Sequence, residues 1–297
     1  MSAEVAESPG AETVAGRSLW MDAWRTLKKN RAAVVSGIII AFMAVLVVIG
    51  PLFSPYAYDF TDWGNLSTGP SVETGHIFGT DTLGRDLFVR TLIGGRISLM
   101  VGIVATLVSL VIGISYGATA GYFGGRLDHV MMRVVDILYA MPFMFFVILL
   151  MVLFGRNIVL IFVAIGVINW LDMARIVRGQ TLTLKAREFV EAAEAQGVST
   201  FAIIRRHIVP NLLGVVAVYV TLTIPQVILV ESFLSFLGLG VQEPMTSWGA
   251  LVKDGAEEME SAAWMLLFPA VFLATTLFCF NFVGDGLRDA LDPKDRV

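Results

Sequence analysis

Charged residues are scarce in this chain of 297 residues. Lys, Arg, Asp and Glu make up 15% of it, as 21 basic and 25 acidic side chains, whereas a soluble globular protein is about 25% charged. Apolar residues reach 56%, and the mean hydropathy is +0.76. This shortage of charge excludes most soluble enzymes, nucleic-acid-binding proteins and disordered proteins, and it predicts a membrane protein. The net charge of −4 is too small to indicate an acidic or basic partner.

Cysteine is almost absent, and histidine is rare. The single Cys279 excludes an internal disulfide framework and a zinc site built on cysteines. His76, His129 and His207 fall in three different predicted loops, so they cannot converge on a metal, and we expect each at a surface or an interface. The phosphate-binding sequence GxxxxGK[ST] is also missing. We therefore expect no metal or cofactor in this chain.

Long stretches without any charge are what the sequence does contain. A helix that crosses about 30 Å of hydrocarbon needs about 20 mostly apolar residues. Five runs are long enough, and a sixth, 157–171, is short for a span. The runs are 32–58, 97–125, 137–155, 157–171, 207–230 and 261–284.

The placement of the basic residues decides whether the short run is a span. With six spans and a cytoplasmic N-terminus, the inner segments hold 16 Lys and Arg, and the outer segments hold five. Without the fourth span the count becomes 8 inside and 13 outside. Because cytoplasmic loops carry an excess of Lys and Arg, six spans with both termini in the cytoplasm are favoured. Asp172 and Arg175 then follow directly after the uncharged run 157–171, where we expect the helix to end.

The predicted fold is an all-α polytopic membrane protein. Residues 1–31 form a polar N-terminal tail rather than a secretory signal, and residues 1–18 are expected to be disordered. The membrane core covers 96–290 and follows an external loop at 57–95. The six predicted spans are 32–56, 97–121, 134–155, 157–175, 212–237 and 262–284, with an internal loop at 176–211 and a cytoplasmic tail at 285–297. Glycines 102, 113, 117 and 121 predict close helix packing in the second span.

The internal loop 176–211 reads as two helices that meet at a turn. Gly197 is the expected stop of the first helix. In the second helix, Phe201, Ile204 and Ile208 are expected to share a face before Pro210 ends it. Small side chains beside acids near the end of the first helix suit a groove on a soluble partner.

The same loop carries a family resemblance. Residues 191–197, EAAEAQG, followed by 207–210, HIVP, resemble the EAA loop of ABC importer permeases. Further stretches resemble the C-type subunit of the peptide/nickel permease branch, and the likeness runs from about residue 20 to the C-terminus. They are 78–86, FGTDTLGRD; 133–136, RVVD, with Pro142; 234–240, LSFLGLG, with 247–249, SWG; and 284–293, GDGLRDALDP. Glu243 departs from the pattern, which more often has an uncharged residue there.

The resemblance implies a type I ABC importer permease in the plasma (inner) membrane of a prokaryote. The implied partners are a homologous B-type permease subunit, two ABC ATPase subunits that bind ATP and Mg²⁺, an extracytoplasmic solute-binding protein and the lipid bilayer, with no nucleic acid. Peptides are the usual cargo and nickel a rarer one. The chain is then a transport subunit that performs no covalent chemistry and couples to the ATPase by alternating access. The implied ATPase-coupling residues are Glu191, Ala192, Ala193, Gly197, His207 and Pro210.

Several polar residues near membrane depth are candidates for the transport path. Thr221, Thr223 and Gln226 fall in the middle of the fifth span beside Pro225, and either pore lining or ordinary interhelical hydrogen bonding explains them. Glu231 lies near the outer end of that span, and structural hydrogen bonding and pore lining are equally favoured there.

Three charged residues nearer the surfaces have a structural and a functional interpretation. Arg85 and Asp86 either contact a binding protein or cap an interfacial helix, and we favour the structural role. For Asp136, pairing with Arg133 is favoured over a role in transport.

Two other functional classes are weighed against the importer. A proton-coupled secondary transporter would use Asp136 or Glu231 as its relay, and it would usually show more spans and an inverted repeat. An intramembrane hydrolase would need a histidine or paired aspartates at matching depth, and no histidine lies within a predicted span. The EAA-like loop counts against both.

Overall fold

The computed structural model describes residues 19–155 and 158–291, and this part of the chain is built from helices without a β-strand. The predicted tail 1–18, Arg156 and residues 292–297 lie outside the described residues. The α-helices are α1 (Leu19–Lys29), α2 (Arg31–Ile49), α3 (Leu87–Phe123), α4 (Gly125–Ala140), α5 (Phe143–Phe154), α6 (Ile158–Lys185), α7 (Glu188–Ala195), α8 (Thr200–Ile203), α9 (Val209–Phe236), α10 (Trp248–Glu257) and α11 (Ala263–Leu291).

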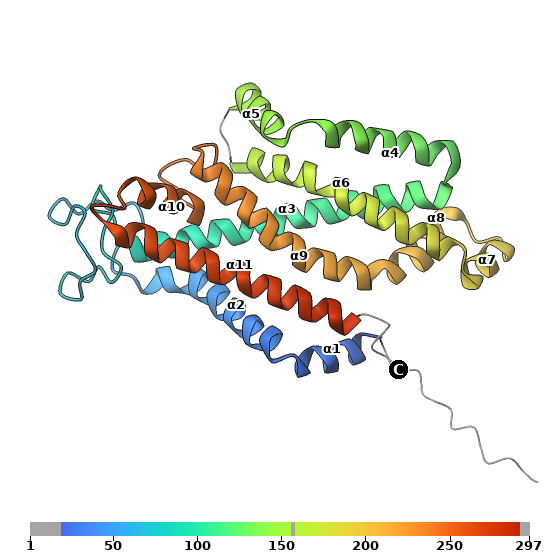
Figure 1. Cartoon of the computed structure of the whole chain (residues 1–297), viewed down its shortest axis with the longest axis horizontal. Coiled ribbons are helices and arrows are strands. Elements are labelled where there is room, and N and C mark those ends of the chain that lie inside the picture. Colours follow the sequence, from blue (N-terminus) through green and yellow to red (C-terminus); the bar gives the residue numbers. More distant parts are fainter. Residues whose placement is uncertain (1–18, 156–157, 292–297) are drawn as a thin grey trace, which may run out of the picture.

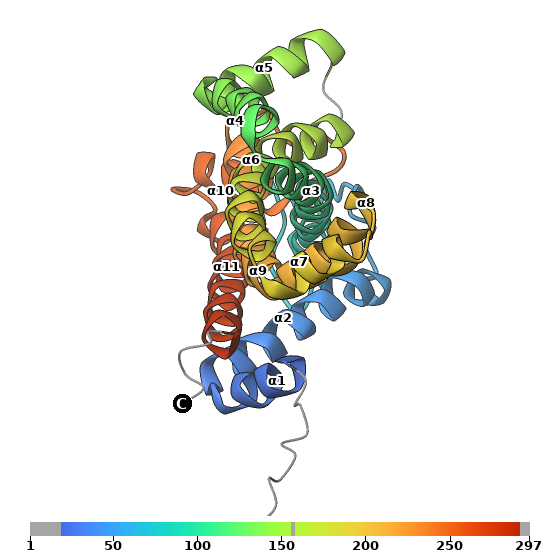
Figure 2. The same ribbon diagram turned by 90° about the vertical axis from the view of Figure 1, so that its right-hand side faces the viewer.

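The long helices run side by side along the longest axis of the molecule (Figure 1). Helix α7 lies at one end, and α10 lies at the other end with the loop 54–86. We call these the α7 end and the α10 end. Seen along the axis in Figure 2, α4 and α5 lie on one flank, α1 and α2 on the opposite flank, and α3 and α6 between them.

The predicted all-α membrane class is confirmed, whereas the count of six spans stays a prediction. Four helical segments are long and apolar enough to cross a membrane, and α4 and α5 together make a fifth if a bent pair counts as one span. Helix α6, with 28 residues, occupies the position of the predicted fourth span. The four segments are Arg31–Phe53, Leu87–Phe123, Thr200–Phe236 and Ala263–Leu291.

The predicted third span, 134–155, is bent. Helices α4 and α5 meet at an angle of 83°. Pro142 lies at the break, where it has no backbone N–H and disfavours a helical conformation for the residue before it. Met141 is accordingly extended, with φ −76° and ψ 128°.

The prediction that a helix ends near Asp172 and Arg175 is wrong, because α6 continues ten residues beyond Arg175, to Lys185. Arg175 and Arg178 are tolerated within the helix because acidic side chains of α4 pair with them. Arg175 pairs with Asp136 at 2.8 Å, and Arg178 makes a bidentate pair with Asp128 at 2.5 and 2.6 Å. Asp172 therefore lies in the middle of α6 instead of at its end.

The predicted close packing of α3 is confirmed at its contact with α6. A Cβ atom on Gly117 would lie 2.4 Å from the backbone oxygen of Ala174. A Cβ atom on Gly113 would lie 2.5 Å from Cγ of Met173, and one on Gly121 would lie 2.8 Å from the backbone oxygen of Arg178. Small residues at such spacing let two helix backbones approach closely.

The sequence predicts that the second helix of the internal loop ends at Pro210, and this prediction is wrong. Helix α8 continues through a π-helical turn, Ile204–Ile208, directly into α9, where Pro210 lies in the first turn. The wider turn bonds the backbone N–H of Val209 to the carbonyl of Ile204. Because a π-turn already departs from the regular ladder, proline fits there without stopping the helix.

Candidate functional site

Helix α7 presents most of its surface outward at its end of the molecule. Val190 and Ala193 are buried against the bundle, while Glu191 and Ala192 are exposed. Acids in the first turn, such as Glu191, are favourable because the N-terminus of a helix carries partial positive charge. The predicted coupling residues therefore divide into one inward side chain, Ala193, and an outward face.

The predicted helix stop at Gly197 is confirmed. Gly197 has φ +77°, in the left-handed region that favours glycine. Its N–H bonds to the carbonyl of Glu194 at 2.9 Å, and the N–H of Val198 bonds to the carbonyl of Ala193 at 3.1 Å. This pair of bonds is a Schellman motif, which satisfies the last carbonyls of α7.

Two polar contacts tie α7 and the end of α6 to α3. The hydroxyl of Tyr122 donates to Oε1 of Glu194 at 2.7 Å. The Nζ atom of Lys185 donates to the backbone oxygen of Tyr122 at 2.7 Å. Apolar packing adds to them, because Val190 and Ala193 share one buried cluster with α3, α6 and α9.

The apolar face of the segment after α7 differs from the predicted one. Ile203 and Ile208 point into the bundle, whereas Phe201 is 72% exposed. His207 is half-buried, and its ring lies 6.5 Å from the ring of Phe189, which is itself 41% exposed. Two phenylalanines, Phe189 of α7 and Phe201 of α8, are thus exposed on the outside of the chain.

Of the four predicted pore-lining residues, only Gln226 is exposed. Thr223 is buried and donates to the backbone oxygen of Tyr219 at 2.8 Å. Thr221 is half-buried and donates to the backbone oxygen of Val218 at 2.8 Å. Both threonines bond to carbonyls of their own helix, α9, rather than to another helix as the alternative interpretation expects.

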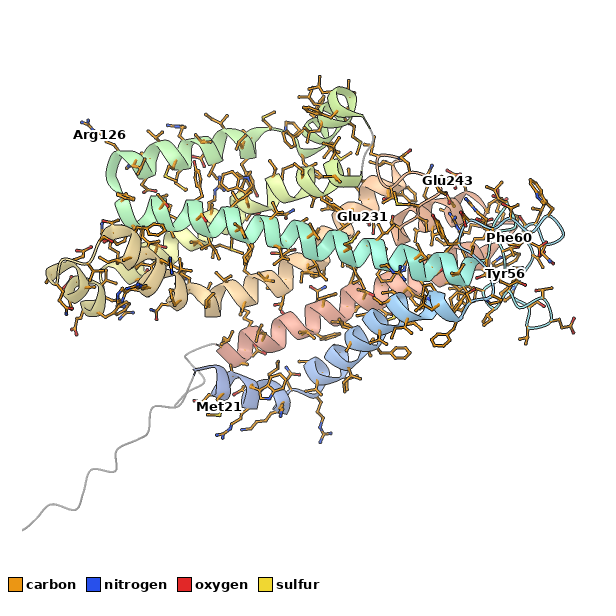
Figure 3. All side chains as sticks on the ribbon, turned by 180° about the vertical axis from the view of Figure 1, so that it is seen from behind. Met21, Tyr56, Phe60, Arg126, Glu231 and Glu243 are labelled. Atoms are coloured by element: carbon orange, nitrogen blue, oxygen red, sulfur yellow. The ribbon has the colours of Figure 1, made fainter. Side chains whose placement is uncertain are left out.

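Glu231, which is labelled in Figure 3, is completely buried within this chain, with 0% of it exposed. It accepts hydrogen bonds from Ser98 of α3 at 3.1 Å and from Ser235 of α9 at 2.6 Å. Ser98 accepts in turn from the backbone N–H of Trp248, and Ser235 contacts Ser247, the N-cap of α10. The carboxylate thus joins three helices, and structural hydrogen bonding is the role that the structure supports.

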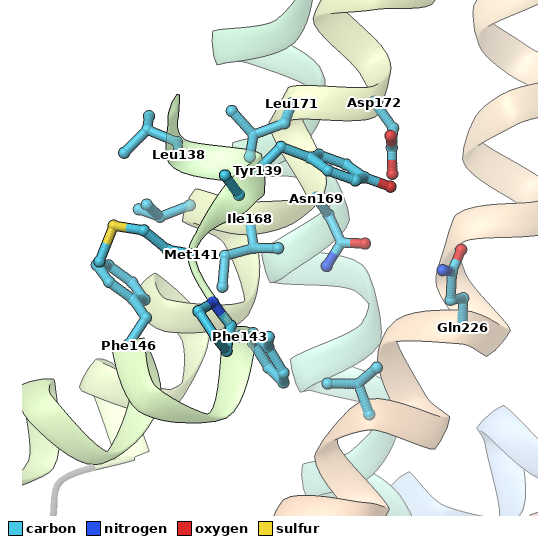
Figure 4. A pocket seen from close by; sticks show the side chains of 14 residues that line it. Leu138, Tyr139, Met141, Phe143, Phe146, Ile168, Asn169, Leu171, Asp172 and Gln226 are labelled. Atoms are coloured by element: carbon cyan, nitrogen blue, oxygen red, sulfur yellow. The ribbon is translucent and has the colours of Figure 1, made fainter. Parts of the chain in front are cut away.

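Gln226 opens onto a cavity of about 430 Å³ between α4, α5, α6 and α9 (Figure 4). Three further polar side chains line it, namely Tyr139, Asn169 and Asp172. Apart from Gln226, these side chains are not among the predicted site residues, because the sequence predicts the end of a helix near Asp172. The signal available was the pairing of an acid with an amide three residues earlier in the same helix.

Arg85 and Asp86 do not form the predicted surface contact, because they are only 7% and 2% exposed. Asp86 is the N-cap of α3 and accepts from the backbone N–H of Val89 at 2.8 Å, as the favoured structural role predicts. Its other carboxylate oxygen lies 2.8 Å from Nδ1 of His76. The prediction of a surface or interface position for His76 is wrong, because its side chain is completely buried. His129 is exposed, as predicted.

Glu243, the residue that departs from the family pattern, pairs with Arg85. Its Oε1 atom lies 2.9 Å from Nη2 of Arg85, and Asp81 contacts Nε of the same guanidinium at 2.6 Å. The hydrogen bond from Arg85 lowers the pKa of Glu243 below its ordinary value. Arg85 thus links the loop before α3 to the loop between α9 and α10.

The predicted pairing of Asp136 with Arg133 is wrong. Asp136 accepts from Nη2 of Arg175 at 2.8 Å, and both side chains are exposed. The guanidinium of Arg175 also lies 4.6 Å from the centre of the ring of Tyr139. This arrangement joins α4 to α6 at the edge of the cavity.

Comparison with known families gives two matches that together cover most of the chain. Residues 109–297 match the family described as the binding-protein-dependent transport system inner membrane component. Residues 18–70 match the N-terminal transmembrane domain of oligopeptide transport permease C.

Relatives and solved structures agree with these matches. The chain is 64% identical over 283 residues to the oligopeptide transport system permease protein OppC of Escherichia coli K12, covering 95% of this chain and 94% of the relative. It is 49% identical to the dipeptide transport system permease protein DppC of Bacillus subtilis, covering 94% and 87%. The inward-facing MetNI methionine ABC transporter is similar in fold, with a TM-score of 0.56 and 20% identity over 69% of this chain and 96% of that chain.

Proposed function

Because the chain belongs to the family of binding-protein-dependent transport system inner membrane components, we propose that it is one of two permease subunits in an ATP-driven peptide importer. A homologous B-type permease would complete the path. Two ABC ATPase subunits would bind ATP and Mg²⁺, and an extracytoplasmic binding protein would deliver the solute. The peptide cargo is supported by the names of relatives that are 64% and 49% identical.

The observation that carries the proposal is the outward face of α7. Glu191 and Ala192 are exposed on a helix that is anchored to the bundle from one side only. Phe189 on α7 and Phe201 on α8 add exposed apolar area at the same end of the molecule. A short helix with small, acidic and aromatic exposed residues suits insertion into a groove of the ATPase. The α7 end would then be cytoplasmic, together with both termini.

The connections of α7 give a route for its movement to reach the bundle. Residues Thr200–Phe236 form one long segment that starts directly after the α7 turn and carries Gln226 at the cavity. Tyr122 and Lys185 connect the same region to α3 and α6. In the proposed cycle, ATP-driven closure of the ATPase subunits moves α7 and rocks these helices. The translocation path between the two permease subunits then opens toward the loaded binding protein, and ATP hydrolysis returns the complex to its starting state.

The test is a charge reversal on the exposed face, Glu191→Arg, in the complex with its permease and ATPase partners in proteoliposomes, with the binding protein present. We expect ATP-driven uptake of trialanine to fall at least about tenfold, which corresponds to about 1.4 kcal/mol of coupling. The chain should stay in the membrane with its permease partner. Ala192→Leu should reduce uptake similarly, because it adds bulk only where a partner would lie.

The matched control is Glu260→Arg, an exposed acid beyond α10. It should leave uptake unchanged. Uptake that persists without ATP and follows an imposed proton gradient would contradict the proposal and favour a secondary transporter.

A further inference from the structure

The cavity between α4, α5, α6 and α9 has the size and lining of a ligand site. Its volume of about 430 Å³ falls in the range of small-molecule pockets, about 300–1,000 Å³. Apolar side chains such as Phe143, Phe146 and Val230 form most of the wall. In Figure 4 the polar ends of Asn169, Asp172 and Gln226 face the space between α6 and α9.

Asp172 has no hydrogen bond or ion pair with any side chain in the described ranges 19–155 and 158–291. The cation that acts on it electrostatically, Arg175, is one turn further along α6. Arg175 is already engaged, because Asp136 binds its guanidinium at 2.8 Å and Tyr139 lies beneath it. The half-buried carboxylate of Asp172 is therefore left to face the cavity.

An acid in the middle of a membrane-protein helix is costly unless it is paired or serves a function. Glu231 shows how this chain handles an acid with a structural role, because two serine hydroxyls satisfy it and it is fully buried. Asp172 has neither feature, and it opens onto space large enough for a ligand. The difference points to a cationic group as the missing partner.

The neighbouring amides match the rest of a peptide. Asn169 donates its Nδ2 hydrogen to the backbone oxygen of Ile165 at 2.8 Å, which orients its Oδ1 atom as an acceptor. Gln226, on the opposite wall, offers both a donor and an acceptor. Carboxamides can bind peptide groups without regard to side chains, and the apolar wall accommodates varied side chains.

We propose that this cavity binds the amino-terminal end of a transported peptide, with Asp172 as the acceptor for its α-ammonium group and Gln226 and Asn169 at the first peptide groups. The inference rests on the proposed function, because it takes the cargo to be a peptide. It adds a recognition step inside the membrane that is separate from selection by the binding protein.

The test measures peptide binding directly, with the binding protein left out. The complete permease–ATPase complex in lipid nanodiscs is titrated by calorimetry with trialanine, N-acetyl-trialanine and trialanine amide. Acetylation removes the ammonium charge, whereas amidation removes only the carboxylate. We expect trialanine and its amide to bind at least about tenfold more tightly than the acetylated peptide.

Variants assign that preference to Asp172. Asp172→Asn should reduce trialanine affinity to the level of the acetylated peptide, and Asp172→Glu should keep the preference. Glu260→Gln is the matched acid-to-amide control at an exposed site and should behave as the wild type. The comparison of the three peptides on the unmodified complex needs no variant, so the test stands even if Asp172→Asn does not assemble.

The outcomes separate this inference from the proposed function. The assignment of the cavity is wrong, and the proposed importer is unaffected, if ATP drives uptake of trialanine but trialanine does not bind the unmodified complex. The same conclusion follows if trialanine binds no more tightly than the acetylated peptide, or if Asp172→Asn still prefers trialanine over the acetylated peptide. Weaker binding of the amide than of trialanine would show recognition of the carboxylate and would also overturn it. If ATP drives no uptake of trialanine in the presence of the binding protein, the proposed function itself fails.

Discussion

The two ends of the molecule treat polar and exposed groups in opposite ways. At the α10 end, Asp81, Arg85 and Arg90 are all buried, and Trp248 is 0% exposed with its Nε1 bonded to the backbone of Thr91. At the α7 end, a helix of eight residues turns Glu191 and Ala192 to the outside.

This difference indicates different mechanical roles. The α10 end is held by several independent contacts, because an ion pair links the loop before α3 to the loop before α10 and hydrogen bonds link α3 to the start of α10. The α7 end is anchored through one helix face and a few polar contacts, which leaves it suited to transmit movement from a partner. Variants that disturb backbone packing should therefore cost more stability at the α10 end, and variants on the surface should cost more function at the α7 end.

The strongest test of this contrast is Gly249→Ala in α10. A Cβ atom there would lie 2.4 Å from Cα of Ser232 and 2.6 Å from its backbone oxygen, and neither atom can move without shifting α9. We expect a loss of about 3 kcal/mol in stability, at the upper end of the usual cost of overpacking. The apparent Tm of the purified chain in detergent measures it. A Tm within one degree of the wild type would show that the α10 end is more compliant than the structure indicates.

The next largest effect is expected from Glu231→Leu. The change leaves the hydroxyl of Ser235 and one bond of Ser98 without their acceptor in a fully buried place. We expect destabilisation of about 2 kcal/mol, whereas Glu231→Gln retains an acceptor and should cost less. Its counterpart at the other end, Glu191→Leu, changes an exposed side chain and should stay within about 0.5 kcal/mol. Equal losses of apparent Tm for both leucine variants would remove the contrast.

A smaller effect on stability is expected from Gly197→Ala, which matches Gly249→Ala in chemistry. No atom lies within 4 Å of the added Cβ, so only the φ of +77° is unfavourable for alanine. The expected cost is about 1 kcal/mol. Uptake by the reconstituted complex should nevertheless fall more than the small Tm shift suggests, because the turn orients α7. Uptake that remains at the wild-type level would show that the turn has no part in coupling.

Local signals were sufficient for much of the fold. Long uncharged runs predicted the all-α membrane class, and Gly197 predicted the end of α7, because both depend on residues that are close in sequence. The sequence predicts the helical segment after α7 for the same reason. Its inward face was assigned to Phe201 instead of Ile203, because a π-turn after α8 shifts the register, and a single sequence does not show where one will form.

The long-range partners could not be predicted. The sequence predicts the end of a helix near Asp172, because charges usually mark the end of a membrane-spanning run. Nothing local indicates that Arg175 pairs with Asp136, which lies 39 residues earlier in the sequence. The sequence does not separate structural hydrogen bonding from pore lining for Glu231 for the same reason, since its partner Ser98 lies 133 residues away. Burial of Arg85 and His76 likewise depends on loops that only the folded chain brings together.

The smallest effect concerns the pH dependence of the α10 end and comes from Glu243→Gln. The pKa of Glu243 is lowered by its hydrogen bond from Arg85, so its ionised form favours the folded state. The contribution is fully present above the ordinary pKa of 4.5 and is lost as the pH falls through the lowered value. Because Glu243 is 62% exposed, solvent screens the pair and the contribution at pH 7 should be below about 1 kcal/mol.

The apparent Tm should therefore decline below pH 4.5 more steeply in the wild type than in Glu243→Gln, while Glu260→Gln should follow the wild type. Parallel Tm curves for the wild type and Glu243→Gln would mean that the exposed member of this ion-pair cluster does not help to hold the α10 end together.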